Sequence, residues 1–134
     1  MERTPREVAH VAAVWWANRI CHPKFDNGDP SMIGGMSTMM ALSNVKEVTK
    51  EQKLKFIDVM TGTLTVQLEK EGAVVELNVD YGPCFALSFL AKQAGIPEEN
   101  FPWKTYMRIW PQRIVASYGY RSEEEYPLDH PEEE

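Results

Sequence analysis

The fold is decided by the stretch KTYMRIWPQRIVAS, residues 104 to 117. Apolar residues alternate with polar or charged ones on both sides of Pro111 and Gln112, and a period of two is typical of strands with one buried face. We therefore expect a β-hairpin with strands over 104–110 and 113–118. Pro111 fits a two-residue primed turn poorly, so the sequence indicates a longer or bulged loop.

The alternation also predicts which residues lie opposite each other. If Trp110 faces Arg113, the pairs Ile109 with Ile114 and Met107 with Ala116 form an apolar face suited to a core. The other face of the hairpin then carries Tyr106, Arg108, Trp110, Arg113, Val115 and Ser117.

This polar face has two interpretations. Aromatic rings can stack on a nucleobase while cations hold its phosphate, which makes the face a candidate ligand site. The candidate residues are Trp103, Lys104, Tyr106, Arg108, Trp110 and Arg113. The alternative is ordinary cross-strand packing, with Trp110 and Arg113 as a surface cation–π pair. The sequence leaves both open.

The remaining elements are mostly helical. Thr4 and Thr49 each begin a capping box, with Glu7 and Gln52 three residues later, and apolar residues follow at helical spacing. In the helix after Thr49 the expected buried stripe is Leu54, Ile57, Met60 or Thr61, Leu64 and Leu68. We expect helices over 4–21, 36–42, 49–71 and 84–94 and a further strand over 73–80. The fold class is α+β: about four helices packed on a small three-stranded antiparallel sheet.

The charge of the chain lies at its C-terminal end. The 134 residues carry a net charge of −6, and residues 121–134 hold seven acids and one base. Residues 1–120 are balanced and long enough for one domain, so direct nucleic-acid binding is disfavoured. Pro127 and Pro131 disfavour a helix in residues 121–134. We expect an acidic, disordered tail, which either aids solubility or acts as a DNA-mimicking or partner-steering arm.

The sequence indicates a cytoplasmic protein that does not enter a membrane. The longest apolar runs are too short to span a bilayer, and the N-terminus has no secretory pattern. Cys21 and Cys84 lie far apart in the sequence, which favours reduced thiols over a disulfide.

A polar loop is the second candidate for ligand contacts. Asp26, Asn27 and Asp29 lie in a turn-rich segment with Gly34 and Gly35 behind it, and glycines let backbone N–H groups approach an anion. The two carboxylates repel phosphate unless a cation bridges them, and the spacing lacks the glutamate that would complete a calcium loop. The loop is either structural or a contact to the ribose or amino groups of a ligand.

Few features favour catalysis. Cys84 lies at the predicted start of a helix, which lowers a thiol pKa, but no histidine in the chain sits in a recognisable catalytic signature. Metal, phosphate-loop and dinucleotide motifs are also lacking. We therefore expect no catalytic residue, no metal and no cofactor.

Several short motifs, in order, carry a resemblance. They are WWA at 15–17, HPKFDNGD at 22–29, DYGP at 80–83, FPWKT at 101–105 and SYGY at 117–120. This order resembles a group of small accessory proteins of tailed phages and prophages whose activity is not established. The resemblance implies a role against bacterial immunity, because small phage proteins without enzyme motifs often bind a defence effector or sequester its nucleotide signal.

Two functional hypotheses follow. In the first, the protein is non-enzymatic, forms a homo-oligomer and sequesters a small anionic, nucleotide-derived signal in the bacterial host cell. In the second, it is a protein–protein inhibitor, similar to an anti-CRISPR protein, that uses exposed aromatic residues as interface anchors or the acidic tail as a nucleic-acid mimic. An enzyme built on Cys84 or Asp29 is the least favoured alternative.

Overall fold

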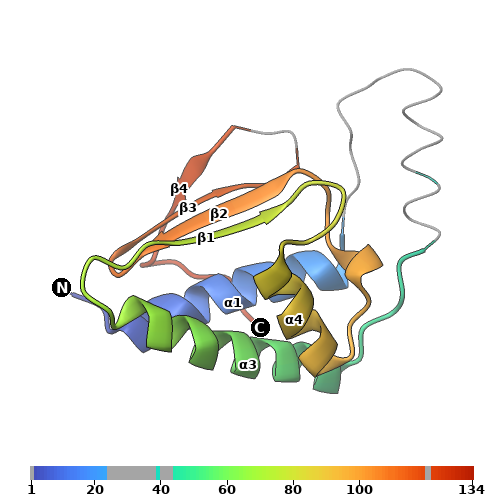
Figure 1. The fold of residues 1–134 in the computed structure, drawn as a ribbon, viewed down its shortest axis with the longest axis horizontal. Helices are drawn as coiled ribbons and strands as arrows, with labels where there is room; N and C mark the ends of the chain where they lie inside the picture. Colours follow the sequence, from blue (N-terminus) through green and yellow to red (C-terminus); the bar gives the residue numbers. More distant parts are fainter. Residues whose placement is uncertain (1, 24–38, 40–43, 120–121) are drawn as a thin grey trace.

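A computed structural model describes residues 2–23, 39, 44–119 and 122–134 of the chain. A four-stranded sheet covers a layer of helices (Figure 1). In chain order the elements are α1 (Pro5–Cys21), α3 (Lys50–Leu68), β1 (Val75–Val79), α4 (Phe85–Ala94), a 3₁₀ turn (Glu98–Asn100), β2 (Thr105–Trp110), β3 (Arg113–Ser117) and β4 (Glu124–Tyr126). The mixed helix and sheet class predicted from the sequence is confirmed.

The sheet is antiparallel throughout, in the order β1-β2-β3-β4. The predicted hairpin register is confirmed, because Trp110 pairs with Arg113 and Ile109 with Ile114. The expected longer or bulged loop is wrong: residues 111 and 112 alone connect the strands. Neither residue has a positive φ, so the turn is not of the primed type that a proline would oppose.

The sheet has four strands where the sequence predicted three. The fourth is β4, which lies within the segment expected to be a disordered tail and pairs with β3 from Ala116 to Ile114. The number of helices also differs from the expected four, with three α-helices in the described ranges. The fourth was expected at 36–42, where the structure describes Met39 alone.

Helix α1 is enclosed by the rest of the molecule. Almost every residue from Val8 to Ala17 is buried, and such an all-round apolar helix belongs inside a domain. It lies between the sheet and α3 (Figure 1). Trp16 is fully buried at this junction and lies 6.3 Å from the Phe101 ring, measured between ring centroids.

The two predicted capping boxes are confirmed. Thr4 and Thr49 accept hydrogen bonds from the backbone N–H groups of Glu7 and Gln52, whose side chains accept in return from the cap backbone. The stripe predicted on α3 is also buried, except that Leu54 remains 42% exposed. Phe56 is fully buried beside it and was not in that prediction.

The buried amide of Asn100 joins three segments. Its Nδ2 donates to the carbonyl oxygens of Ile20, at 3.0 Å, and Lys46, at 2.8 Å. Its Oδ1 accepts from the Lys46 backbone N–H at 2.9 Å. The end of α1, the segment before α3 and the 3₁₀ turn are thereby held together.

The C-terminal acids dock on the first helix. Glu132 accepts hydrogen bonds from Asn18 and Arg19, and Glu134 lies 2.7 Å from the Nε2 atom of His10. Asp129 pairs with Arg3 at 2.6 Å, just before α1. Both ends of the chain therefore contact each other on one side of the molecule.

Candidate functional site

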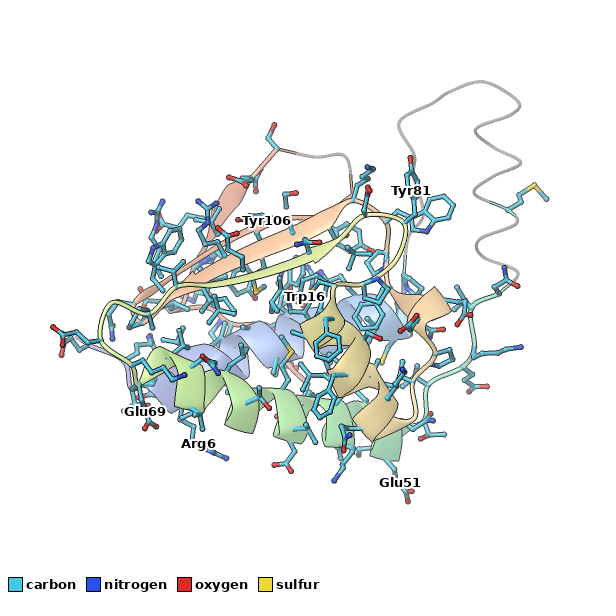
Figure 2. The ribbon with its side chains drawn as sticks, viewed as in Figure 1. Arg6, Trp16, Glu51, Glu69, Tyr81 and Tyr106 are labelled. Carbon is cyan, nitrogen blue, oxygen red and sulfur yellow. The ribbon has the colours of Figure 1, made fainter. Side chains whose placement is uncertain are left out.

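The candidate site is the face of the sheet that points away from the helices. We call it the outer face, and it consists of Glu76, Asn78, Tyr106, Arg108, Trp110, Arg113, Val115, Ser117 and Glu125. Figure 2 places Tyr106 on this side and Trp16 beneath the sheet among the helices. Within the described part of the chain, the helices lie on the opposite side (Figure 1).

The hairpin positions a row of rings and guanidinium groups along this face. The Cζ atom of Arg108 lies 5.6 Å from the centre of the Tyr106 ring and 5.7 Å from that of Trp110. The Cζ atom of Arg113 lies 4.9 Å from the Trp110 ring centre. Trp110 therefore lies between two cations, at distances where a cation–π attraction operates.

Each of these cations also has a carboxylate partner. Arg108 Nε lies 3.0 Å from Glu76 Oε1, and Arg113 Nε lies 2.8 Å from Glu125 Oε1. These four charges balance, and the arginine side chains are 39% and 53% exposed. The outer face thus presents rings and ion pairs rather than an uncompensated positive charge.

The two glutamates are site residues that the sequence interpretation missed. Glu76 could have been found, because the alternation of β1 places it on the solvent side and the register then sets it opposite Arg108. Glu125 had no such signal, since it lies in a segment predicted to be disordered. Its place follows from the pairing of β4 with β3.

Trp103 and Lys104 are not part of the row on the outer face. They lie at the end of the sheet where β1 ends and β2 begins. Trp103 packs edge-on against Tyr81 with 5.3 Å between ring centres. Lys104 forms an ion pair with Asp80, and its Nζ atom lies 4.7 Å from the Tyr81 ring centre. The six aromatic and basic candidates thus divide into a group of four and a group of two.

The backbone of Lys104 is unusual. Its φ of 55° is the one positive value outside glycine in the described ranges. Its N–H donates to the Asp80 carbonyl at 3.0 Å, and its side chain returns to the same residue. The hydrogen bond to Asp80 raises the Lys104 pKa, so the side chain keeps its charge. These contacts hold a conformation that non-glycine residues rarely adopt.

Tyr106 is neutral on the outer face. Burial raises the pKa of its phenol above the usual value of 10.0, against the opposing effect of Arg108. At neutral pH the ring therefore adds a hydroxyl group and no charge to the row. Asp26, Asn27 and Asp29, the remaining candidates, lie outside the described residues.

An open hollow adjoins the outer face at the end of the hairpin. It has a volume of about 410 Å³ and is lined by Arg113, Glu125, Gln112 and Arg3, among others. A separate cavity of about 680 Å³ lies between the end of α1 and the start of α3, with Cys21, His22, Lys50 and Lys53 in its lining. Neither brings Trp110 or Tyr106 into an enclosed pocket.

Of the two residues on which a catalytic alternative was built, the structure describes Cys84 and not Asp29. Cys84 is the N-cap of α4 and, like Cys21, is a free thiol. Among the residues that the structure describes, no group of three or more histidine, cysteine or acidic side chains is arranged to hold a metal ion. In the same residues, no helix is both long and apolar enough to cross a membrane.

Comparisons with protein-family models, with curated proteins and with solved structures find no match to this chain.

Proposed function

We propose that this chain is a non-catalytic binding protein whose outer face docks on the surface of another protein. Together with the resemblance to phage accessory proteins, the proposal makes it an inhibitor of a host defence effector, acting in the bacterial cytoplasm. The single observation that carries the proposal is Trp110 held between Arg108 and Arg113 on an open sheet face.

The composition of the outer face favours a protein partner. Trp, Tyr and Arg are the residues most enriched among those that dominate binding energy at protein interfaces. Here all three types are pre-positioned on a rigid hairpin, which lowers the entropy lost on binding. Arg108 and Arg113 already have carboxylate partners, so their attraction for a free phosphate is reduced.

The contacts of the acidic segment also favour the aromatic residues as the interface anchors. A nucleic-acid mimic needs its carboxylates free in solution, but Glu125, Asp129, Glu132 and Glu134 each contact a basic residue of this chain. Residues 122–134 therefore support the fold, and the interface anchors are the rings of the outer face.

The second candidate is sequestration of a nucleotide-derived signal. It is favoured by the same ring of Trp110, which can stack on a base while the two guanidinium groups lie within reach of phosphate. Small-molecule sites are usually concave, and this face is open. A nucleotide site here needs a further surface to enclose the ligand and must displace Glu76 or Glu125.

Affinity capture from a bacterial lysate, followed by measurement of the purified pair, tests the proposal. Trp110→Ala should weaken binding of the captured protein by about 30-fold or more, as expected for an interface anchor. Val66→Ala is the matched control, because this side chain is exposed on α3 in the helical layer. It should leave the affinity unchanged.

Native mass spectrometry of the same samples separates the two candidates. A protein partner that is lost with Trp110→Ala and kept with Val66→Ala supports docking. A nucleotide mass on the purified wild-type chain that disappears with Trp110→Ala supports sequestration instead. Equal binding by both variants, whatever the ligand, would remove the outer face from the function.

A further inference from the structure

Residues 122–134 contact two separate surfaces of the molecule, and we call them the C-terminal segment. At its beginning, Glu125 of β4 lies on the outer face, where it pairs with the Arg113 guanidinium that contacts the Trp110 ring. At its end, the acids that follow β4 pair with basic residues of α1 and with Arg3 just before that helix. The segment therefore joins the outer face to α1.

The hydroxyl group of Tyr126 connects the two ends of the segment. Its Oη atom accepts a hydrogen bond from the backbone N–H of Glu132 at 3.0 Å, and Tyr126 is the last residue of β4. The Glu132 carboxylate in turn accepts from Arg19 and, at 2.9 Å, from Asn18. Direct contacts thus run from Arg19 on α1 to Tyr126, whose chain neighbour is Glu125.

Glu132 is the main polar anchor of the segment on α1. The side chains of Glu132 and Arg19 are 29% and 22% exposed, whereas the acids of the other three ion pairs of the segment are 47 to 83% exposed. Partly buried pairs are screened less by salt, and exposed pairs contribute little to stability. The Cζ atom of Arg19 also lies 4.3 Å from the centre of the Trp15 ring, which fixes the guanidinium group beneath Glu132.

The remaining contacts of the segment are weak, so it can leave the body of the molecule as a unit. Its side chains are exposed except for those of Tyr126, Leu128 and Glu132, and β4 pairs with β3 over three residues only. Regions with so few buried contacts open at a small fraction of the free energy of global unfolding. A segment with a docked and a released state, both of which involve two surfaces, is the physical requirement for coupling between those surfaces.

We propose that docking of the C-terminal segment on α1 controls the outer face, with Glu132 as a remote positioning residue for Trp110. While Glu132 is docked on Arg19, β4 stays on the edge of β3. Glu125 then holds the Arg113 guanidinium beside the Trp110 ring. Release of the segment removes this tether, so an acidic group that competes for Arg19 weakens binding at the outer face. This regulation rests on the docking function proposed above.

The tryptophans of the chain report the coupling without any binding partner. Trp15 lies under Arg19 on α1, and Trp110 lies on the outer face. Trp103, which packs against Tyr81 at the end of the sheet, is the internal control. In the full chain labelled with 5-fluorotryptophan, fluorine NMR gives a resonance for each ring, and single Trp→Phe variants assign them. Failure of the outer face to bind a partner leaves this measurement unaffected.

Replacement of Glu132 tests whether the two surfaces are coupled. Glu132→Ala should shift the resonances of Trp15 and Trp110 together and leave that of Trp103 in place. Glu123→Ala, which removes the same charge from an exposed position of the same segment, should shift neither. For a protein captured by the outer face, Glu132→Ala should also weaken binding by about two- to fivefold, the contribution of one exposed cation–π contact.

Two further variants separate coupling from a general loss of structure. Tyr126→Phe removes the connecting hydroxyl group and keeps the ring, so it should shift the Trp110 resonance in the same direction. In a Glu125→Ala background, Glu132→Ala should still shift Trp15 but have no further effect on Trp110, because the tether to the outer face is already absent.

A Trp110 resonance that stays in place when Glu132→Ala shifts Trp15 overturns the proposal. So does a chain in which Glu132→Ala shifts neither ring, or a further shift of Trp110 in the double variant as large as that in the single one. Where Glu132→Ala also displaces the Trp103 resonance, Tyr126→Phe decides, and an unmoved Trp110 in that variant overturns the coupling.

Discussion

At the scale of single residues, Asn100 shows how one buried amide organises the chain around it. It is fully buried and uses both donors and its acceptor on backbone groups of Ile20 and Lys46. A buried polar group that loses its partner keeps the full penalty of dehydration. The helical layer therefore depends on this side chain more than on any single exposed ion pair.

Asn100→Ala should lower the free energy of unfolding by about 2 to 4 kcal/mol, because it removes the hydrogen-bond partner of the buried Ile20 carbonyl and of two part-buried backbone groups of Lys46. Urea denaturation monitored by circular dichroism measures the change. Asn78→Ala is the matched control, since this asparagine is exposed on β1, and it should shift the free energy by less than about 0.5 kcal/mol. Equal effects of the two variants would contradict the role given to Asn100.

Residue contacts could be predicted from the sequence only where a regular pattern fixed them. The opposition of Trp110 and Arg113 followed from the alternation of apolar and polar residues on both sides of Pro111 and Gln112. The pairing of Lys104 with Asp80 did not, because it depends on a left-handed backbone at Lys104 that no residue preference favours. The group of four candidates was therefore foreseeable, and its separation from Trp103 and Lys104 was not.

At the scale of elements, two glycines of the helical layer have opposite roles. Gly95 ends α4 with a φ of 73°, and a Cβ atom there would also lie 3.4 Å from the Gln52 side-chain nitrogen. Gly62 lies inside α3, where an added Cβ would meet nothing within 4 Å. The first glycine is required by its backbone conformation, and the second weakens its helix.

Gly62→Ala should raise the free energy of unfolding by about 0.5 to 1 kcal/mol, and Gly95→Ala should lower it by about 1 kcal/mol. Because the substitution is the same at both sites, each variant is the control for the other. Thermal and urea denaturation measure the change in the free energy of unfolding for both. Two shifts in the same direction would contradict the opposite roles given to these two glycines.

The docking of the C-terminal segment on α1 should depend on pH. Burial raises the pKa of Glu132, but hydrogen bonds from Arg19 and Asn18 outweigh it and hold the pKa below its ordinary value of 4.5. A carboxyl group whose pKa is lowered by folding stabilises the folded state above that value and loses the contribution as the pH falls through the folded pKa.

Acidification below about pH 4.5 should therefore release this segment from α1. The Asn18 side-chain amide, which donates to Glu132 at 2.9 Å, is the reporter in an NMR titration. Glu132→Gln should remove most of its pH dependence, whereas Glu123→Gln, at an exposed position, should not. An unchanged titration in Glu132→Gln would assign the transition to other carboxyls.

Elements with strong local signals were predictable, and β4 was not. Capping boxes and apolar spacing located α1 and α3 to within a few residues. Strand β4 consists of Glu124, Glu125 and Tyr126, a sequence too short and too acidic to indicate a strand. It forms because β3 offers a free edge and Arg113 offers a partner for Glu125.

At the scale of the whole molecule, β4 and the acids around it protect an edge and supply the net charge. The strand covers the side of β3 that does not pair with β2. Residues 1–120 hold equal numbers of acids and bases, so all of the −6 net charge comes from the segment that carries β4. Uncovered strand edges and low net charge both promote association between chains.

A variant truncated after residue 120 should therefore aggregate at neutral pH. The time course of static light scattering measures the aggregation. The triple variant Glu123→Gln/Glu124→Gln/Glu133→Gln separates the two causes, because it reduces the charge and retains β4. We expect it to stay dispersed. Aggregation of both proteins to the same extent would assign the effect to charge, and a dispersed truncated chain would show that β4 protects nothing.

The enclosure of α1 has a consequence for the order of synthesis. Translation produces this helix first, yet the side of it that does not face α3 is covered by strands that end at Ser117 and by a segment beyond them. At usual elongation rates the ribosome needs about 5 to 20 seconds to make the intervening chain. During that time Trp15, Trp16 and their neighbours have no tertiary partners from the sheet. We therefore expect the nascent chain to expose apolar surface of the kind that ribosome-associated chaperones bind until its last strands emerge.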